Sequence, residues 1–110
     1  MSALVVGAAG QLGREIVALL GGEVAWAGDR GEIDATDAAA VSALVAHQRP
    51  DVVFNATAYN RVDSAESDPG AAFAVNAAAC HFLARAARDS GALLVHYSTD
   101  YVFDGTASRP

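Results

Sequence analysis

The chain begins with an apolar run, Ala3–Val6, and three glycines follow at once, at positions 7, 10 and 13. In such a loop the first glycine (Gly7) permits a tight turn and the second (Gly10) lets a phosphate approach the backbone. The third (Gly13) lets a helix pack closely on a strand. The segment therefore predicts a strand, a phosphate-binding turn and a helix, with a merely structural turn as the alternative. A P-loop is excluded, because no Lys-Ser or Lys-Thr pair follows.

The rest of the chain alternates between predicted strands and predicted helices. The strands are expected at Ala3–Val6, Glu23–Ala27, Asp51–Asn55 and Ala92–Tyr97. The first helix is expected to end at Gly21, the second to run from an N-cap at Thr36 to before Pro50, and the third from Pro69 to about Ser90. The 3.6-residue period predicts a buried face for each helix. The predicted members are Leu12, Ile16, Leu19 and Leu20 in the first helix; Val41, Leu44 and Val45 in the second; and Phe73, Ala77, Cys80, Ala84 and Ala87 in the third.

This alternation predicts an α/β fold. Strands joined by helical crossovers are parallel, and right-handed crossovers give a doubly wound, Rossmann-like sheet. We expect a single domain over residues 1–110, with four strands in the order 3-2-1-4. The chain then reverses between strands one and four, and a crevice opens beyond their carboxyl ends. The glycine loop and Ser98–Tyr101 are expected to flank that crevice.

Composition excludes several classes of protein. A net charge of −6 and a pI near 4.7 argue against binding to nucleic acid or to an anionic membrane. No apolar stretch approaches the roughly 18 residues of a membrane span, and the first apolar run lacks the basic flank of a signal peptide. The single cysteine, Cys80, is expected to be a buried structural thiol in a cytoplasmic protein. The three histidines lack the spacing of metal ligands, so no metal is predicted.

Three polar residues after the second strand suggest how a nucleotide is held. Asp29 stands where an acidic residue meets the adenosine ribose, whereas Arg30 can pair with a 2′-phosphate, so the two point to different cofactors. A solvated turn is the alternative. Asp34 either reaches the adenine amino group or caps the next helix. The polar segment 55–63 can line the crevice from the other side, and the alternative is an ordinary surface loop.

Four segments resemble the dTDP-4-dehydrorhamnose reductase family of extended short-chain dehydrogenases/reductases. The glycine loop is shared by that whole superfamily, whereas His96–Gly105 is specific to this family and its close relatives. The other two segments are Ile33–Asp37 and Pro50–Tyr59 with Val62–Glu66. The resemblance covers essentially the whole chain.

The resemblance implies an NADPH- or NADH-dependent oxidoreductase of dTDP-rhamnose biosynthesis, which reduces dTDP-4-dehydro-6-deoxy-L-mannose to dTDP-L-rhamnose. The implied cofactor contacts are Gly10, Gln11 and Leu12 with the pyrophosphate, Asp29 with the ribose, Asp34 and Ala35 with the adenine, and Ala58, Tyr59 and Asn60 with the nicotinamide ribose. Thr99 is implied to donate a hydrogen bond to the substrate carbonyl oxygen as the Ser/Thr member of a catalytic triad. Val62 and Asp100 are implied sugar contacts, and a homodimer of the full-length protein is compatible with the family.

The chain departs from the family pattern in ways that leave alternatives open. Asn60 stands where threonine is expected, and Thr57 where alanine is expected. Family members continue with a Tyr-x-x-x-Lys pair and a C-terminal substrate-binding half, whereas this chain has no lysine. Because a phenol needs a nearby ammonium to act as an acid at neutral pH, we expect this N-terminal portion to be inactive alone. The alternatives are a non-catalytic nucleotide-binding subunit, like the regulatory subunit of methionine adenosyltransferase, and another nucleotide-sugar reductase or epimerase.

Overall fold

The computed structural model describes residues 1–57 and 69–97, and in them strands and helices alternate as the sequence predicts. The strands are β1 (Ala3–Val6), β2 (Val24–Gly28), β3 (Val52–Asn55) and β4 (Leu93–His96). The helices are α1 (Gln11–Leu20), α2 (Ala38–Gln48) and α4 (Pro69–Ser90), and a short 3₁₀ helix, η1 (Gly21–Glu23), follows α1. The observed bounds of β1 are the predicted ones, and the ends of the other strands differ from the predicted ones by at most one residue.

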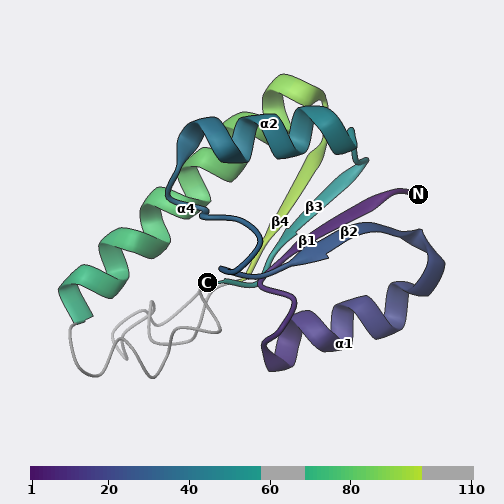
Figure 1. The fold of residues 1–110 in the computed structure, drawn as a ribbon, viewed down its shortest axis with the longest axis horizontal. Helices are drawn as coiled ribbons and strands as arrows, with labels where there is room; N and C mark the ends of the chain where they lie inside the picture. Colours follow the sequence, from purple (N-terminus) through teal and green to yellow (C-terminus); the bar gives the residue numbers. More distant parts are fainter. Residues whose placement is uncertain (58–68, 98–110) are drawn as a thin grey trace, which may run out of the picture.

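The four strands form one parallel sheet in the order β2-β1-β3-β4. Helix α1 lies on one face of this sheet, and α2 and α4 pack together on the other (Figure 1). This arrangement confirms the α/β, doubly wound class. Three layers result, with the sheet in the middle.

The predicted strand order, 3-2-1-4, is wrong, because β3 pairs with β1 and not with β2. Burial explains the observed order. The apolar run of β3 needs cover on both faces, which an inner position provides, whereas β2 alternates half-buried with exposed residues and suits an edge. The chain therefore reverses between β1 and β3, where α2 crosses back over β1. The crevice expected at such a reversal lies beyond the carboxyl ends of these two strands, not beyond strands one and four.

The main core lies between the sheet and the layer of α2 and α4. Its buried members are Leu4, Val6, Val41, Val45, Val53, Leu83, Ala86 and Ala87. Val41 and Val45 are fully buried, and Leu44 packs at the margin of the cluster. The inner face predicted for α2 is thus confirmed.

The predicted buried face of α1 is only partly right. Ile16 is buried, but Leu19 is 87% exposed. Helix α1 packs mainly on β1, β2 and the adjoining η1, and Leu19 lies outside the stripe of the helix that these elements cover.

The predicted buried face of α4 is also only partly right: Ala87 is buried as predicted, and Cys80 is half-buried. The buried positions are Ala79, Leu83, Ala86 and Ala87, whereas Ala77 and Ala84 are exposed. Leu83 is fully covered and sets the rotation of a helix whose many alanines offer little contrast between faces. The side chain of Phe73 lies outside the described residues. Although α4 has 22 residues, neither it nor another helix of the described segments is apolar enough to cross a membrane.

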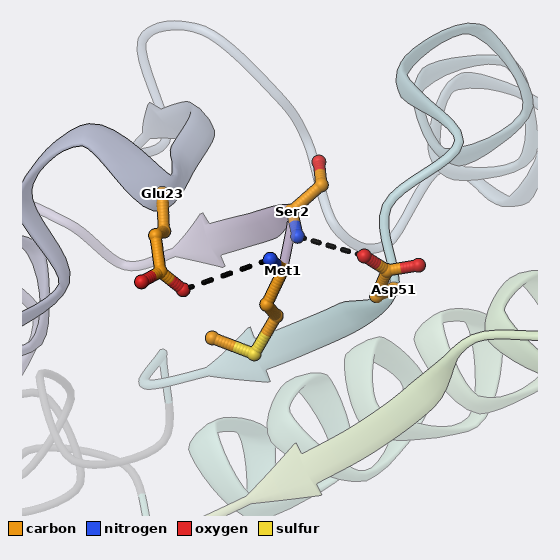
Figure 2. Close-up of polar contacts among 4 residues, drawn as sticks. All are labelled: Met1, Ser2, Glu23 and Asp51. Atoms are coloured by element: carbon orange, nitrogen blue, oxygen red, sulfur yellow. Dashed lines mark hydrogen bonds and ion pairs between the residues drawn. The ribbon is translucent and has the colours of Figure 1, made fainter.

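The amino ends of the strands are tied together by Asp51 (Figure 2). The Ser2 amide donates to Asp51 Oδ2 at 2.8 Å, and the Ser2 carbonyl accepts from the amides of Asp51 and Val52. The Leu93 amide in turn donates to the Asp51 carbonyl. Nearby, the Met1 ammonium lies 3.8 Å from Glu23 Oε1. These contacts fix one end of the sheet, and the polar loops that can bind a ligand gather at the opposite end.

Candidate nucleotide-binding site

The glycine loop joins β1 to α1 and is held against the end of β2. Gly7 has a φ of 89°, which side-chain-bearing residues rarely adopt. The amides of Gly7 and Ala8 both donate to the Gly28 carbonyl, at 2.9 and 3.0 Å. A Cβ atom on Gly13 would lie 2.0 Å from the Gly7 carbonyl oxygen, so the helix packs closely at this glycine, against the loop that follows the strand rather than against the strand itself.

The N-terminus of α1 has no side-chain cap. Its N-cap is Gly10, which offers no side-chain acceptor, and the first turn contains no acidic residue. The amides of the first turn, including those of Gln11 and Leu12, point out of the helix without an intrahelical acceptor. Such a helix end carries partial positive charge and favours an anionic group.

Asp29 follows β2 directly and supports the glycine loop. Its Oδ2 accepts from the Ala9 amide at 3.1 Å, and its Oδ1 accepts from the Arg30 amide at 2.8 Å. Its own amide donates to Glu32 Oε1 at 2.6 Å. The Asp29 carboxylate is thus turned toward the loop. The bond to Ala9 was not foreseen from the sequence, because the two residues lie twenty positions apart.

The segment before α2 corrects two capping predictions. Asp34 Oδ1 accepts from the amide of Thr36 at 3.0 Å and from its hydroxyl at 2.6 Å. The N-cap of α2 is Asp37, whose Oδ1 accepts from the Ala40 amide at 3.1 Å. Thr36 is therefore not the cap, because its hydroxyl is bound to Asp34, and Asp34 does not cap the helix either.

These segments enclose a pocket of about 240 Å³ at the carboxyl end of the sheet. Five predicted cofactor residues line it: Gly10, Asp29, Arg30, Asp34 and Ala35. Six lining residues were not predicted as contacts: Val6, Ala9, Ile33, Thr36, Thr57 and Ala79. Val6 ends β1 and Thr57 closely follows β3, and the chain reverses between these two strands. This position is a signal that could have identified both residues.

The other predicted site residues divide into two groups. Gly7, Gln11, Leu12 and Gly13 lie in the glycine loop and the first turn of α1 but do not line the pocket. Ala58, Tyr59, Asn60, Val62, Thr99 and Asp100 lie outside the described residues. The segment Ser98–Tyr101, expected to flank the crevice, lies outside them as well.

A buried amide, Asn55, connects the pocket to the edge of the sheet. It ends β3 and is fully buried. Its Oδ1 accepts from the amide of Thr57 at 3.1 Å and from the Thr57 hydroxyl at 2.6 Å. Its Nδ2 lies 3.0 Å from Nδ1 of His96, which ends β4. His96 is therefore a hydrogen-bonded histidine.

Cys80 is a free, half-buried thiol on α4, and burial raises its pKa above the ordinary value. A raised pKa makes the thiolate scarce near neutral pH, which fits a structural residue. Within residues 1–57 and 69–97, no three His, Cys, Asp or Glu side chains are grouped so that they could hold a metal ion.

Comparisons with known proteins agree with this geometry. The family model described as "RmlD substrate binding domain" matches residues 1–110. A dTDP-4-dehydrorhamnose reductase of Streptomyces griseus is 50% identical over 109 residues, which are 97% of this chain and 36% of that protein. A dTDP-4-keto-6-deoxy-D-glucose reductase of Streptomyces niveus is 48% identical over 109 residues, again 97% of this chain and 38% of that protein.

A solved structure shows the same arrangement of strands and helices. The dTDP-4-dehydrorhamnose reductase of Bacillus anthracis, crystallised in complex with NADP, has a TM-score of 0.84 and 35% identity. The match covers 100% of this chain and 40% of that one. This chain therefore spans little more than a third of the length of these relatives. Because the family model matches every residue of the chain, the chain belongs to the RmlD substrate binding domain family.

Proposed function

We propose that this chain forms the cofactor-binding part of an NAD(P)H-dependent dTDP-4-dehydrorhamnose reductase, which reduces dTDP-4-dehydro-6-deoxy-L-mannose to dTDP-L-rhamnose. The observation that carries the proposal is the pocket at the carboxyl ends of β1 and β3, bounded by the glycine loop on one side and Thr57 on the other. Open α/β sheets bind nucleotides at this place. The relatives named above supply the reaction and the substrate of the proposal.

The described residues fit one end of a dinucleotide. The uncapped first turn of α1 would hold the pyrophosphate, and Gly10 leaves room for it to approach the backbone. Asp29 and Arg30 would face the adenosine ribose, and Asp34 with Ala35 the adenine. The volume of the pocket is below the range of about 300–1,000 Å³ that is typical of complete small-molecule sites. The pocket therefore suits the adenosine half of a dinucleotide. The nicotinamide, when bound, would supply the hydride.

Arg30 favours NADPH over NADH. Its side chain lines the pocket and is exposed, and no ion pair joins it to an acidic residue within the described residues. The neighbouring Asp29 carboxylate accepts from the amide of Ala9, in the glycine loop, and from the backbone amide of Arg30. Arg30 is therefore available to pair with a 2′-phosphate.

The chemical step is assigned to residues outside the described part of the chain. We propose that Thr99 donates a hydrogen bond to the substrate carbonyl oxygen and that Val62 and Asp100 contact the sugar. Ala58, Tyr59 and Asn60 would lie along the nicotinamide ribose. Removing one hydrogen bond to developing charge lowers kcat by roughly 10²-fold, so Thr99→Val should reduce kcat of the full-length protein on that scale. An unchanged kcat would contradict this role.

Calorimetric titration of the purified protein with NADPH and with NADH tests cofactor binding directly. Arg30→Ala should raise the Kd for NADPH roughly tenfold, the scale of one hydrogen bond to a charged group, and change the Kd for NADH little. Arg14→Ala is the matched control, because Arg14 is exposed on α1 and does not line the pocket. Failure of the unaltered protein to bind either dinucleotide would refute the proposed function.

A second candidate substrate comes from the Streptomyces niveus relative, whose name specifies dTDP-4-keto-6-deoxy-D-glucose. Its identity to this chain is nearly that of the Streptomyces griseus relative. Comparing kcat/KM of the full-length protein for the two dTDP-sugars decides between them. Reduction of the D-glucose derivative alone would replace the first substrate by the second.

A further inference from the structure

A chain of hydrogen bonds runs from His96 on the edge strand to Thr57 in the pocket, and it has a fixed direction. The Thr57 amide can only donate, and it lies 3.1 Å from Asn55 Oδ1, so this atom is the acceptor oxygen. The amide nitrogen of Asn55 therefore faces His96. Since Nδ2 can only donate, His96 Nδ1 must accept, and the neutral ring must carry its proton on Nε2.

The same bonds determine what Thr57 can offer to a ligand. Its hydroxyl proton is directed to Asn55 Oδ1 at 2.6 Å, so only the lone pairs of its oxygen remain. Thr57 lines the pocket. A hydroxyl whose proton is bound to Asn55 can accept from a ligand but cannot donate to it. The matching ligand group is a hydrogen-bond donor, such as a ribose hydroxyl or an amide NH₂.

We propose that His96 is a positioning residue: through Asn55 it orients the Thr57 hydroxyl to accept from a nucleotide in the pocket. The proposal rests on the proposed function, since it assumes that the pocket binds a nucleotide. Without the acceptor on His96, the fully buried Asn55 amide would lose its partner, which is costly because water cannot replace it.

Among the described residues, no charged group competes with Asn55 for the His96 ring. The paired strand, β3, carries no charged side chain from Val52 to Asn55. Helix α4, which packs on β4, carries His81, Arg85, Arg88 and Asp89, and none of these forms a hydrogen bond or ion pair with His96 in the described structure.

Binding of ADP-ribose, which keeps both ribose hydroxyls, provides the test. At about pH 8, His96→Phe should raise the Kd roughly fivefold, the scale of one neutral hydrogen bond. His96→Asn is the matched control, because its Oδ1 is as many bonds from the backbone as Nδ1 of histidine and can accept from Asn55 Nδ2. Its Kd should stay within about twofold of that of the unaltered protein.

Thr57 supplies an independent arm. Thr57→Val should raise the Kd as His96→Phe does, Thr57→Ser should restore binding, and the double variant should cost no more than either single one, because the two residues act through one chain of bonds. Additive effects, or a His96→Asn variant that binds no better than His96→Phe, would overturn the proposal.

Two outcomes must be kept apart. If the unaltered protein binds neither ADP-ribose nor NADPH at about pH 8, the proposed function is wrong. The hydrogen-bond chain is then still tested by ¹⁵N NMR of the His96 ring, which should show an unprotonated Nδ1 at that pH. A proton on Nδ1 of the neutral ring would overturn the inference whether or not a nucleotide binds, and this measurement also serves if His96→Phe fails to fold.

Discussion

Replacing Gly13 by alanine should destabilise the protein more than an ordinary surface change. The new Cβ would lie 2.0 Å from the Gly7 carbonyl oxygen and 2.8 Å from Ala8 Cα. These are backbone atoms and cannot rotate away, so α1 and the loop must separate by roughly 1 Å. Overpacking of this kind costs about 1–3 kcal/mol, and the rigid neighbours place the cost near the upper end. Since alanine also gains about 1 kcal/mol over glycine within a helix, the expected net loss is about 2 kcal/mol.

Urea denaturation followed by circular dichroism measures this loss as a change in the free energy of unfolding. Gly22→Ala is the matched control, because a Cβ atom there meets nothing within 4 Å and Gly22 is not at positive φ. That change should be neutral or stabilise by up to about 1 kcal/mol. If Gly13→Ala unfolds within about 0.5 kcal/mol of the unaltered protein, the loop accommodates a side chain and the close packing described above is not required.

Two further predictions concern helices α1 and α4. Leu83→Ala should lower the free energy of unfolding by about 2–5 kcal/mol, because Leu83 is fully buried, whereas Leu19→Ala should change it by less than about 0.5 kcal/mol; similar urea midpoints for the two variants would contradict the burial pattern. Burial raises the pKa of the Cys80 thiol in the folded protein, so the unfolded chain loses the thiol proton at a lower pH than the folded protein does. The protein is therefore most stable below the ordinary cysteine pKa and loses stability as the pH rises above that value. From about pH 7 to about pH 10 the unaltered protein should therefore lose more stability than Cys80→Ala, and parallel thermal melting curves for the two would refute this.

The sequence predicted the alternation of elements well because each boundary carries a local signal. Gly21 ends α1, and Pro69 begins α4. The period of Val41 and Val45 identified the inner face of α2, since few other large apolar residues compete for it. In α4 the period failed, because alanines occur on every side and any of several stripes looks equally apolar.

The order of the strands was not available from local signals. Which strand lies beside β1 depends on how helices α1 and α2 cover the two faces of the sheet, and pairs such as Val5 with Phe54 are set by the complete fold. The candidate site likewise combines residues that local sequence signals identify with contacts that only the complete fold creates. Asp29 and Arg30 were found from their position after β2, whereas the bond from Ala9 to Asp29 and the chain from Thr57 to His96 join residues that only the folded sheet brings together.

The placement of β3 beside β1 has a consequence for the route by which the chain folds. β1 pairs with β2 after a short connection through α1, whereas pairing Ala3 with Val52 requires the chain to close a much longer loop around α2. Contacts between residues distant in sequence carry the larger entropic cost and slow folding. We therefore expect the β1-α1-β2 unit to form before β3 docks. Thr57, which follows β3, would then reach the glycine loop only in that last step, so the acquisition of nucleotide affinity during refolding would coincide with the slowest phase of sheet assembly.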